Sequence, residues 1–367
     1  MRIFVYVKII LILFFLVGCG KDLEDNPKRN IYSSEISIEN LLIIDNGKRV
    51  GEGSFVKLKN NTLAYLYTCF KNGTADSSSS DICLVKSNDI DRKVWTEPEV
   101  LIENHGLLNI MSVSALKLKT QNKIIIQYLE KNNCNNLKIV RRYSDVNLDE
   151  ISDIHYIKQN TGYNVVNNDR LLEYNDKLYT PISRHSCDEN GIFKYNGIIE
   201  LSITDESNDS EHIVKIPLEN NITFQEPGIV NLYDGSLLMW FRTSTNNMLI
   251  SKSTDFGKTF SAIKKSVINT IPYSPSSIKN FNNDLFIVYN KFPSVGNKKN
   301  QRTPLVLAIS QDNLNSIDKE YTIENNKSMG YMYPSLFKDN KNLILAYMVK
   351  NKNKFFVKIV KFKNMFK

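Results

Sequence analysis

The 367-residue sequence is poor in several features on which other classes of protein depend. It has no block of lysines and arginines with interleaved aromatic residues, so we expect no nucleic-acid partner. Cysteine and histidine do not occur together at metal-ligand spacing, and the four histidines lie far apart, so we predict no metal site and no cofactor. Charged residues, 23% of the total, are scattered rather than run together, and 42% of the residues are hydrophobic. This composition argues against disorder and is sufficient for a sizeable core.

Long helical patterns are missing as well. No window sustains an apolar period of 3.6 residues, whereas short β-rich runs alternate with turn residues along the whole chain. We therefore expect an all-β protein with few helices. The formal net charge of +8 favours anionic partners. Most lysines lie in turns between the β-rich runs, however, and we interpret them mainly as a solvated surface.

The N-terminus lacks an apolar run long enough for a membrane helix. Arg2 and Lys8 precede nine apolar residues, 9–17, whereas about 20 are needed to cross a bilayer. The following LVGC, residues 16–19, resembles the lipobox of bacterial lipoproteins. We predict a lipoprotein signal peptide (1–18), a lipidated Cys19 with a polar tether (19–34), and anchoring in the cell envelope, on the outer membrane or cell surface. An ordinary signal peptide with an incidental cysteine is the alternative.

A strand–turn–strand unit recurs six times after the tether. The copies begin SFVKLKNN, SVSALKLK, NDRLLEYN, EPGIVNLY, SSIKNFNN and YPSLFKDN, at residues 54, 112, 168, 226, 276 and 333. The steps between them are 58, 56, 58, 50 and 57 residues, too regular for chance and too long for the coil of a solenoid. Two further β-rich runs follow most copies. This pattern predicts a six-bladed β-propeller of four-stranded antiparallel blades over residues 35–367.

The last repeat ends at Lys367 without an outer strand, whereas the run at residues 35–45 precedes the first repeat without a partner. Docking this N-terminal strand onto the last blade would close the ring and cover an exposed sheet edge. A pair of β-sandwiches, the alternative fold, does not account for six equal units.

Four cysteines remain after Cys19, and an exported chain can form disulfides. Cys69 and Cys83 flank one predicted strand turn, so we expect them to pair across neighbouring strands. Cys134 and Cys187 can pair only if the loops of adjacent blades meet.

The segment STDFGKTF, residues 253–260, resembles the Asp-box of sialidases and related propellers. In such a turn Asp255 can accept backbone hydrogen bonds, Gly257 can take a positive φ, and Phe260 can pack between blades. Degenerate copies begin at Ser87, Tyr143 and Ser310. These boxes are structural and indicate lineage, not a catalytic site.

The chain from about residue 51 to residue 347 resembles the sialidase-like propellers with BNR repeats, most clearly in QEPGIVNLYDGSLLMWFRT, YSPSSIKNF, RTPLVLAISQDN and YMYPSLF. The resemblance implies an exo-glycosidase in which Tyr333 is the nucleophile and Glu226 its base. It implies that Arg242 and Arg302 hold the carboxylate of the sugar, and that Asp76 is the acid/base. A tyrosine is the suitable nucleophile for such a sugar, because a carboxylate nucleophile would meet like charge.

One position departs from the family pattern. Sialidases normally carry the first arginine at the start of the first inner strand, where this sequence reads Gly51-Glu52-Gly53. Arg49 lies two residues too early, and Glu52 would repel an acidic sugar. The branch with GEGSF, NIMSVS and VNNDR at the first three inner strands is described only as sialidase-like, so the substrate can be another glycan. Further substrate-binding candidates at the ends of inner strands are Glu52, Asn109, Asp169, Arg170 and His185.

These residues also have structural interpretations. Glu226 with Arg242 can be a structural ion pair, Tyr333 can pack in the channel, and Arg302 can be a solvated loop residue. Asp81 competes with Asp76 for the role of the acid. Two functional hypotheses therefore stand: a monomeric, surface-exposed glycosidase acting on sialoglycoconjugates or other oligosaccharides, and a glycan-binding propeller without turnover.

Overall fold

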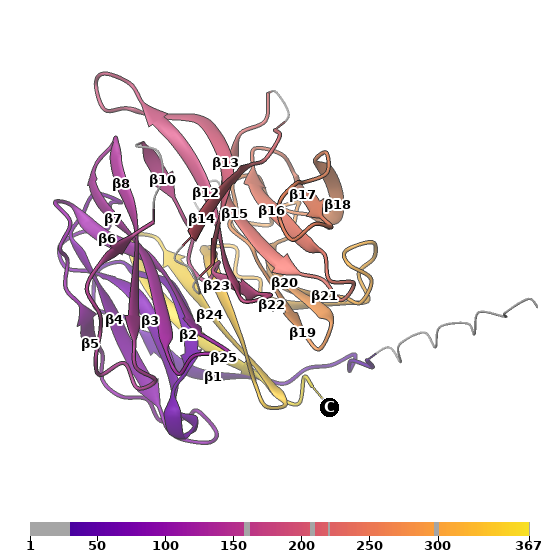
Figure 1. The fold of residues 1–367 in the computed structure, drawn as a ribbon. Helices are drawn as coiled ribbons and strands as arrows, with labels where there is room; N and C mark the ends of the chain where they lie inside the picture. Colours follow the sequence, from indigo (N-terminus) through magenta and orange to yellow (C-terminus); the bar gives the residue numbers. More distant parts are fainter. Residues whose placement is uncertain (1–29, 158–161, 206–209, 219–220, 297–300, 367) are drawn as a thin grey trace, which may run out of the picture. The chain divides into compact units, whose positions relative to one another are not determined.

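The computed structural model describes residues 30–157, 162–205, 210–218, 221–296 and 301–366. The predicted signal peptide, Cys19 and most of the tether lie outside the described residues. Apart from the 3-10 turn η1 (Lys59–Asn61), the regular structure of this part consists of β-strands (Figure 1). None of its helices has the length and apolar character needed to cross a bilayer.

Six antiparallel sheets succeed one another along the chain as the blades of a propeller, which confirms the predicted fold. Blade 1 consists of β2 (Val50–Lys57), β3 (Leu63–Phe70), β4 (Ser80–Ser87) and β5 (Glu99–Ile102), and blade 2 of β6 (Asn109–Lys117), β7 (Ile124–Asn133), β8 (Asn136–Ser144) and β9 (His155–Tyr156). Blade 3 consists of β10 (Tyr163–Val165), β11 (Leu172–Tyr174), β12 (Lys177–Cys187), β13 (Phe193–Asp205) and β14 (Ser210–Lys215). Blade 4 consists of β15 (Phe224–Asn231), β16 (Leu237–Thr243), β17 (Asn247–Ser253) and β18 (Lys264–Asn269), and blade 5 of β19 (Ser277–Phe281), β20 (Asp284–Asn290), β21 (Leu305–Ser310) and β22 (Lys319–Glu324).

Blade 6 combines both ends of the propeller. It contains β23 (Met329–Asp339), β24 (Asn342–Asn351) and β25 (Lys354–Phe362), and its outer strand is β1 (Ile38–Ile44). β1 pairs antiparallel with β25, with Ile38 opposite Phe362 and Ile44 opposite Val357. The N-terminal strand therefore closes the ring, as predicted, and the edge of β25 is covered.

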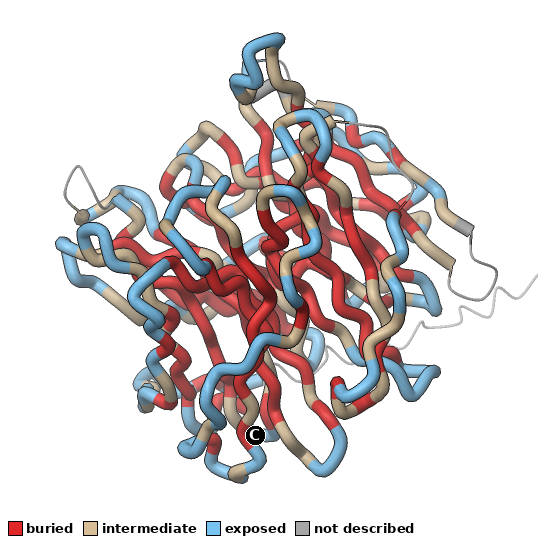
Figure 2. Tube along the Cα trace, turned by 90° about the vertical axis from the view of Figure 1, so that its left-hand side faces the viewer, coloured by how far each residue is buried: buried red, intermediate tan, exposed pale blue. Residues whose placement is uncertain are grey.

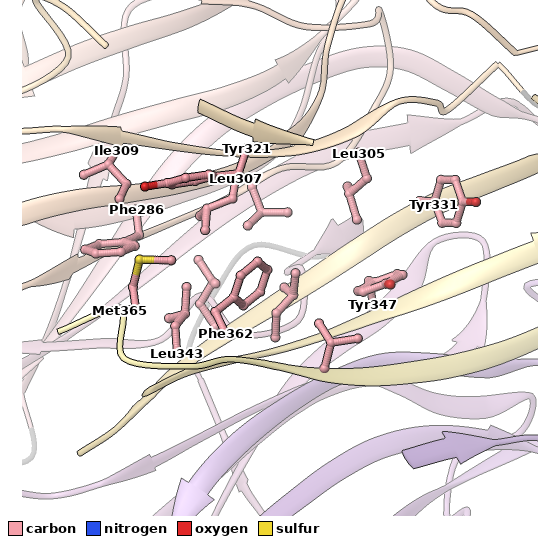
Figure 3. Close-up of a cluster of buried hydrophobic side chains, with 14 of the residues drawn as sticks. Phe286, Leu305, Leu307, Ile309, Tyr321, Tyr331, Leu343, Tyr347, Phe362 and Met365 are labelled. Carbon is pink, nitrogen blue, oxygen red and sulfur yellow. The ribbon is translucent and has the colours of Figure 1, made fainter. Parts of the chain in front are cut away.

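Apolar side chains fill the wedges between neighbouring blades. Between blades 5 and 6, Phe286, Leu307, Leu343, Tyr347 and Phe362 are fully buried in one cluster (Figure 3). Buried residues run in continuous stretches along the strands, whereas the loops at the blade ends are largely exposed (Figure 2). Each blade is thus held by its two neighbours, and the inner strands are fixed around the ring axis.

The Asp-box turns have the predicted structural role. Asp255 accepts hydrogen bonds from the backbone N–H of Thr259 at 2.9 Å and from the Ser253 hydroxyl at 2.8 Å. Gly257 has a φ of +87°, and Phe260 packs against the apolar cluster between blades 3 and 4. The degenerate copies contain the same hydrogen bond, in which the Asp carboxylate accepts from the backbone N–H four residues later. The donor and acceptor pairs are Lys93 and Asp89, Asp149 and Asp145, and Ser316 and Asp312.

Both disulfides considered from the sequence are present. Cys69 and Cys83 link β3 to β4, with Cα atoms 5.8 Å apart. Cys134, between β7 and β8, pairs with Cys187 at the end of β12, with Cα atoms 6.0 Å apart. The second bond joins blades 2 and 3, so the loops of these adjacent blades do meet.

Candidate functional site

The inner strands of four blades carry a bulge at the same place in the ring. The pairing register shifts around Glu52, Ser112, Glu226 and Tyr333, in blades 1, 2, 4 and 6. Each of these residues has a positive φ, between 35° and 61°, which is strained for a side chain other than glycine. Bulges re-aim side chains out of the sheet pattern. All four residues here line one pocket.

The pocket has a volume of about 420 Å³. Of the residues predicted from the sequence, it is lined by Glu52, Asp76, His185, Glu226, Arg242, Arg302 and Tyr333. It is also lined by Arg49, Met111, Ser112, Leu129, Lys131, Leu137, Tyr163, Val165, Ser183, Phe193 and Gln225. The charged lining therefore comprises four cations and three carboxylates, which leaves the pocket with a net positive charge that suits an anionic ligand.

Arg49 belongs to this pocket, although its position in the sequence seemed too early for the clamp. Its guanidinium lies 4.8 Å from the ring centroid of Phe70, and its Nη2 donates to Glu52 at 2.6 Å. Its Nη1 also donates to Asp76. Burial alone would lower the pKa of Arg49, but Glu52 and Asp76 outweigh it and raise the pKa, so Arg49 stays charged.

Glu52 faces Arg49 and is not a free negative charge. It is only 3% exposed, and it accepts a second hydrogen bond from the Ser112 hydroxyl at 2.5 Å. Burial raises its pKa, against the opposing effect of Arg49 and Ser112. Glu52 therefore orients Arg49 from behind, and the repulsion of an acidic sugar expected from the sequence is reduced by this pairing.

Arg242 lies between the glutamate and the tyrosine predicted to act together. Its Nη1 donates to Glu226 at 2.6 Å, and its pKa is raised by Glu226 and by the nearby Tyr333. Burial and then the nearby Glu226 raise the pKa of Tyr333 to about 12. The Tyr333 hydroxyl is therefore neutral at neutral pH, with a carboxylate base close by.

A main-chain carbonyl holds two of the arginines. The Tyr273 carbonyl accepts a hydrogen bond from Arg242 Nε at 2.9 Å and one from Arg302 Nη2 at 3.2 Å. Arg302 also lies over the Tyr333 ring, with 5.9 Å between its Cζ and the ring centroid. The two guanidinium groups are thereby fixed side by side next to Tyr333.

Asp76 lies on the loop between β3 and β4, whose base is closed by the Cys69–Cys83 disulfide. Its side chain is 66% exposed and lines the pocket. Partial burial alone would raise the pKa of Asp76, but the Arg49 guanidinium outweighs it and holds the pKa below its usual value. Asp81, the alternative acid, is bound to the Asn104 amide and Lys71 instead and does not line this pocket.

Asn109 does not line the pocket. Its side chain is fully buried, and its Nδ2 donates to the carbonyls of Asp76 at 2.8 Å and Ser78 at 3.0 Å. Lys131 Nζ lies 3.4 Å from the same Asp76 carbonyl and 3.3 Å from the Tyr163 hydroxyl. Blade 2 therefore holds the loop of the candidate acid.

His185 faces the apolar side of the pocket. It is 5% exposed, its Nδ1 has no hydrogen-bond partner, and its ring lies 4.9 Å from that of Phe193. Burial lowers the pKa of His185 to about 4, so the imidazole is neutral. It can donate or accept one hydrogen bond with an uncharged ligand group.

Asp169 and Arg170 lie on the ring axis and do not line the pocket. They belong to the segment 166–171, which interrupts the inner edge of blade 3 between β10 and β11. Asp169 accepts hydrogen bonds from Ser54 at 3.0 Å, from Lys279 at 2.9 Å and from the Leu336 amide at 3.2 Å. It thus ties blades 1, 5 and 6 to blade 3.

Sequence reasoning discounted Arg49 and missed Lys131. Lys131 lies near the end of the second strand of blade 2, opposite Asn109. The position in blade 2 that corresponds to Arg242 in blade 4 is occupied by Leu129, two residues before Lys131, so equivalence of ring positions does not identify Lys131. Within the described residues, no group of three or more histidines, cysteines and carboxylates is placed to hold a metal ion.

A family comparison accounts for most of this chain. The model of the BNR repeat-like domain matches residues 64–345. The chain belongs to this BNR repeat-like family. The match includes Asp76, Glu226, Arg242, Arg302 and Tyr333 and begins after Arg49. No curated protein sequence matches the chain.

Several solved structures share the fold. A Dyadobacter fermentans protein of unknown function aligns with a TM-score of 0.68 and 15% identity over 89% of this chain and 99% of its own. The intramolecular trans-sialidase from Ruminococcus gnavus, in complex with oseltamivir carboxylate, aligns with a TM-score of 0.68 and 14% identity over 88% of this chain and 97% of its own. The leech intramolecular trans-sialidase aligns with a TM-score of 0.69 and 15% identity over 89% and 70%. At these identities the likeness shows that the BNR chain has a sialidase-like fold.

Proposed function

We propose that this BNR propeller is an exo-glycosidase that removes a terminal acidic sugar of the sialic-acid type from glycans. The single observation that carries the proposal is the convergence of Arg49, Arg242 and Arg302 with Tyr333 and Glu226 on one pocket. Guanidinium groups bind a planar carboxylate through paired hydrogen bonds. A binding protein would need the arginines, whereas a neutral tyrosine beside a carboxylate base in the same pocket is what nucleophilic catalysis requires.

The reaction would proceed in two displacements at the anomeric carbon. The Tyr333 oxygen attacks this carbon and passes its proton to Glu226, while Asp76 protonates the glycosidic oxygen and the bond to the leaving group breaks. Water then attacks the same carbon and gives a proton to Asp76. The Tyr333 oxygen leaves and recovers its proton from Glu226. Two inversions retain the anomeric configuration.

Replacing the nucleophile tests this proposal. Tyr333→Phe removes one hydroxyl, and we expect release of 4-methylumbelliferone from its sialoside to fall by at least about 1,000-fold. Tyr331→Phe is the matched control, because Tyr331 lies two residues away and packs between blades 5 and 6 outside the pocket. The control should keep wild-type activity. Far-UV circular dichroism and thermal unfolding should show that both variants are folded.

Two other outcomes would replace the proposal. A wild-type protein that is inert on a broad panel of sugar conjugates but is retained on a glycan array would be a binding module. Release of a neutral sugar but no acidic one would assign the pocket to another glycosidase activity. Equal activity of Tyr333→Phe and the wild type would remove Tyr333 from the mechanism.

We further propose that the chain is exported and anchored through Cys19. The two disulfides support this location, because such bonds persist mainly in oxidising compartments. Incorporation of labelled palmitate that is lost in Cys19→Ala would support the anchor. Export of an unlabelled, cleaved protein would indicate an ordinary signal peptide instead.

A further inference from the structure

The Glu226 carboxylate has a second partner, which the two-displacement mechanism does not use. Its Oε1 accepts from Arg242, and its Oε2 accepts a hydrogen bond from the side-chain Nδ2 of Asn167 at 3.1 Å. Asn167 belongs to the segment 166–171 of blade 3 and is only 2% exposed. It does not line the pocket, so it can act on a ligand only through the glutamate.

The direction of the Asn167 amide is fixed by its neighbour in the chain. Asn167 Oδ1 accepts a hydrogen bond from the backbone N–H of Asn168 at 2.7 Å. A flipped amide would direct its NH₂ group at this N–H and its oxygen at the Glu226 carboxylate, which would pair donor with donor and acceptor with acceptor. The donor end of Asn167 therefore faces Glu226.

The backbone around Asn167 is attached to blade 2. The Ser114 hydroxyl, in β6, donates to the Asn167 carbonyl at 3.4 Å and accepts from the Arg170 N–H at 2.9 Å. Val166 and Leu171, at the two ends of the segment, are buried in apolar clusters. These contacts hold the amide at a fixed place beside the glutamate.

Two donors thus reach the Glu226 carboxylate from different elements, Arg242 from β16 and Asn167 from blade 3. The Glu226 backbone is held as well, because its N–H donates to the Ser183 hydroxyl at 3.3 Å. Each carboxylate oxygen can accept about two hydrogen bonds, so acceptor capacity remains for the proton of Tyr333. A donor at Oε2 also favours the charged form of a carboxylate over the neutral form.

We propose that Asn167 is a positioning residue for the base Glu226. It holds the carboxylate at Oε2, in the orientation and the charge state in which the base can take the proton of Tyr333. This inference rests on the proposed function, because it takes Glu226 to be the base. It gives the segment 166–171 a role beyond filling the ring axis: Asp169 and Arg170 serve the axis, whereas Asn167 serves the pocket.

Removing the donor tests this role. In Asn167→Ala the arginines of the pocket are unchanged, so we expect kcat for the fluorogenic sialoside to fall about tenfold while KM changes by less than twofold. The acidic limb of the kcat/KM profile should move to higher pH by about one unit, because the carboxylate loses a donor that favours its charged form. A purely structural defect would reduce the amount of folded protein and leave this limb in place.

Other charged and titratable groups surround Glu226, and Asn167→Ala leaves all of them in the chain. They are Glu52 of β2, Tyr163 of β10, Arg170 of the segment 166–171, His185 of β12, Arg242 of β16, Arg302 before β21 and Tyr333 of β23. A shift of the acidic limb in the variant therefore reports the lost donor.

Asn280→Ala is the matched control. Asn280 Nδ2 donates to the Asn231 carbonyl at 2.8 Å and so links the inner strands of blades 5 and 4, but it does not line the pocket. This variant should keep the wild-type kcat and the wild-type position of the limb. Asn167→Asp keeps the acceptor for the Asn168 N–H but sets a second carboxylate against Glu226, so its limb should move further than that of Asn167→Ala. A limb that stays in place in both Asn167 variants would overturn the assignment.

A titration that needs no turnover separates this inference from the proposed function. In protein labelled with ¹³C at the glutamate carboxyl groups, the NMR signal of Glu226, assigned by its absence in Glu226→Gln, follows the protonation of this residue. Its midpoint should lie about one pH unit higher in Asn167→Ala than in the wild type. If the wild type releases no sugar but the midpoint moves, Asn167 holds Glu226 as inferred and the catalytic role of the glutamate is rejected. Equal midpoints in the two proteins would reject the role of Asn167 whatever the activity.

Discussion

Two polar clusters lie on the axis of the propeller, and they differ in how their charges are used. In the candidate pocket, Arg242 and Glu226 contact each other but also face a cavity of about 420 Å³. In the axial cluster, Asp169 meets a hydroxyl, an ammonium and a backbone amide and does not line that cavity. Both clusters come from the same region of the inner strands. The charged groups of the pocket can still bind a ligand, whereas the hydrogen-bonding capacity of Asp169 is used by groups of the protein.

The difference shows that buried charge near a propeller axis does not identify a binding site. Asp169 and Glu226 both have a positive φ and both have cationic partners. They are distinguished by what closes the remaining space around them. Blade 3 folds the segment 166–171 inward at Asp169, whereas at Glu226 the space stays open.

The sharpest test of this comparison is one amide substitution in each cluster. Asp169→Asn directs an NH₂ group at either Lys279 or the Leu336 amide, and we expect the free energy of unfolding to fall by roughly 3 kcal/mol. Glu226→Gln should change it by less than about 1 kcal/mol, because water in the open pocket can solvate Arg242. Urea unfolding followed by tryptophan fluorescence measures both.

For activity, we expect the opposite order of the two variants: Glu226→Gln should have the larger effect and Asp169→Asn the smaller. Glu226→Gln should abolish sialoside hydrolysis, whereas folded Asp169→Asn should retain it at low temperature. If Asp169→Asn were as stable as the wild type but inactive, the axial cluster would belong to the functional site and the distinction would fail.

Removing Arg49 tests the pocket side of the comparison. Arg49→Met should lower kcat/KM for a sialoside by roughly 100-fold, because a charge-assisted bond to the substrate is lost. The substitution should also raise the pKa of Asp76, which Arg49 lowers in the wild type. An acid must be protonated to donate, so the alkaline limb of the kcat/KM profile should move to higher pH.

Arg184→Met provides the control for the loss of an arginine–glutamate pair. Arg184 Nη2 lies 3.0 Å from Glu200 Oε1 in blade 3, and neither residue lines the pocket. Its pH profile should match that of the wild type. An unchanged alkaline limb in Arg49→Met would mean that Asp76 is not the group that titrates there.

Local patterns were enough to predict the ring, but only part of the site. Glu226 and Arg242 could be paired from the sequence because a hairpin of known length brings them together. Arg49 could not, because the bulge that follows it shifts the register between Gly51 and Ser54, and a shift of this kind is not visible in the residue types. Asp169, predicted as a pocket residue, lies outside the pocket for a different reason: closure of the ring decides whether an inner residue meets solvent or the side chains and amides of three other blades, and that depends on contacts between distant repeats.

The smallest expected effect concerns Arg170, a second cation of the axial cluster beside Lys279. It stacks on Trp240 at 4.8 Å and donates to the Ser276 carbonyl, but its Nε and Nη1 have no partner. Burial lowers the pKa of Arg170 to about 10.

The desolvation of a buried charge with few partners costs about as much free energy as its interactions contribute. Arg170→Met, which keeps an unbranched side chain over Trp240, should therefore change the free energy of unfolding by less than about 1 kcal/mol and leave sialoside hydrolysis unchanged. Urea unfolding and the fluorogenic assay measure the two effects, with Asp169→Asn as the destabilised reference. A loss of activity in a stable Arg170→Met protein would connect the axis to the pocket, and a loss of stability comparable to that of Asp169→Asn would make the cation a structural partner of the same rank.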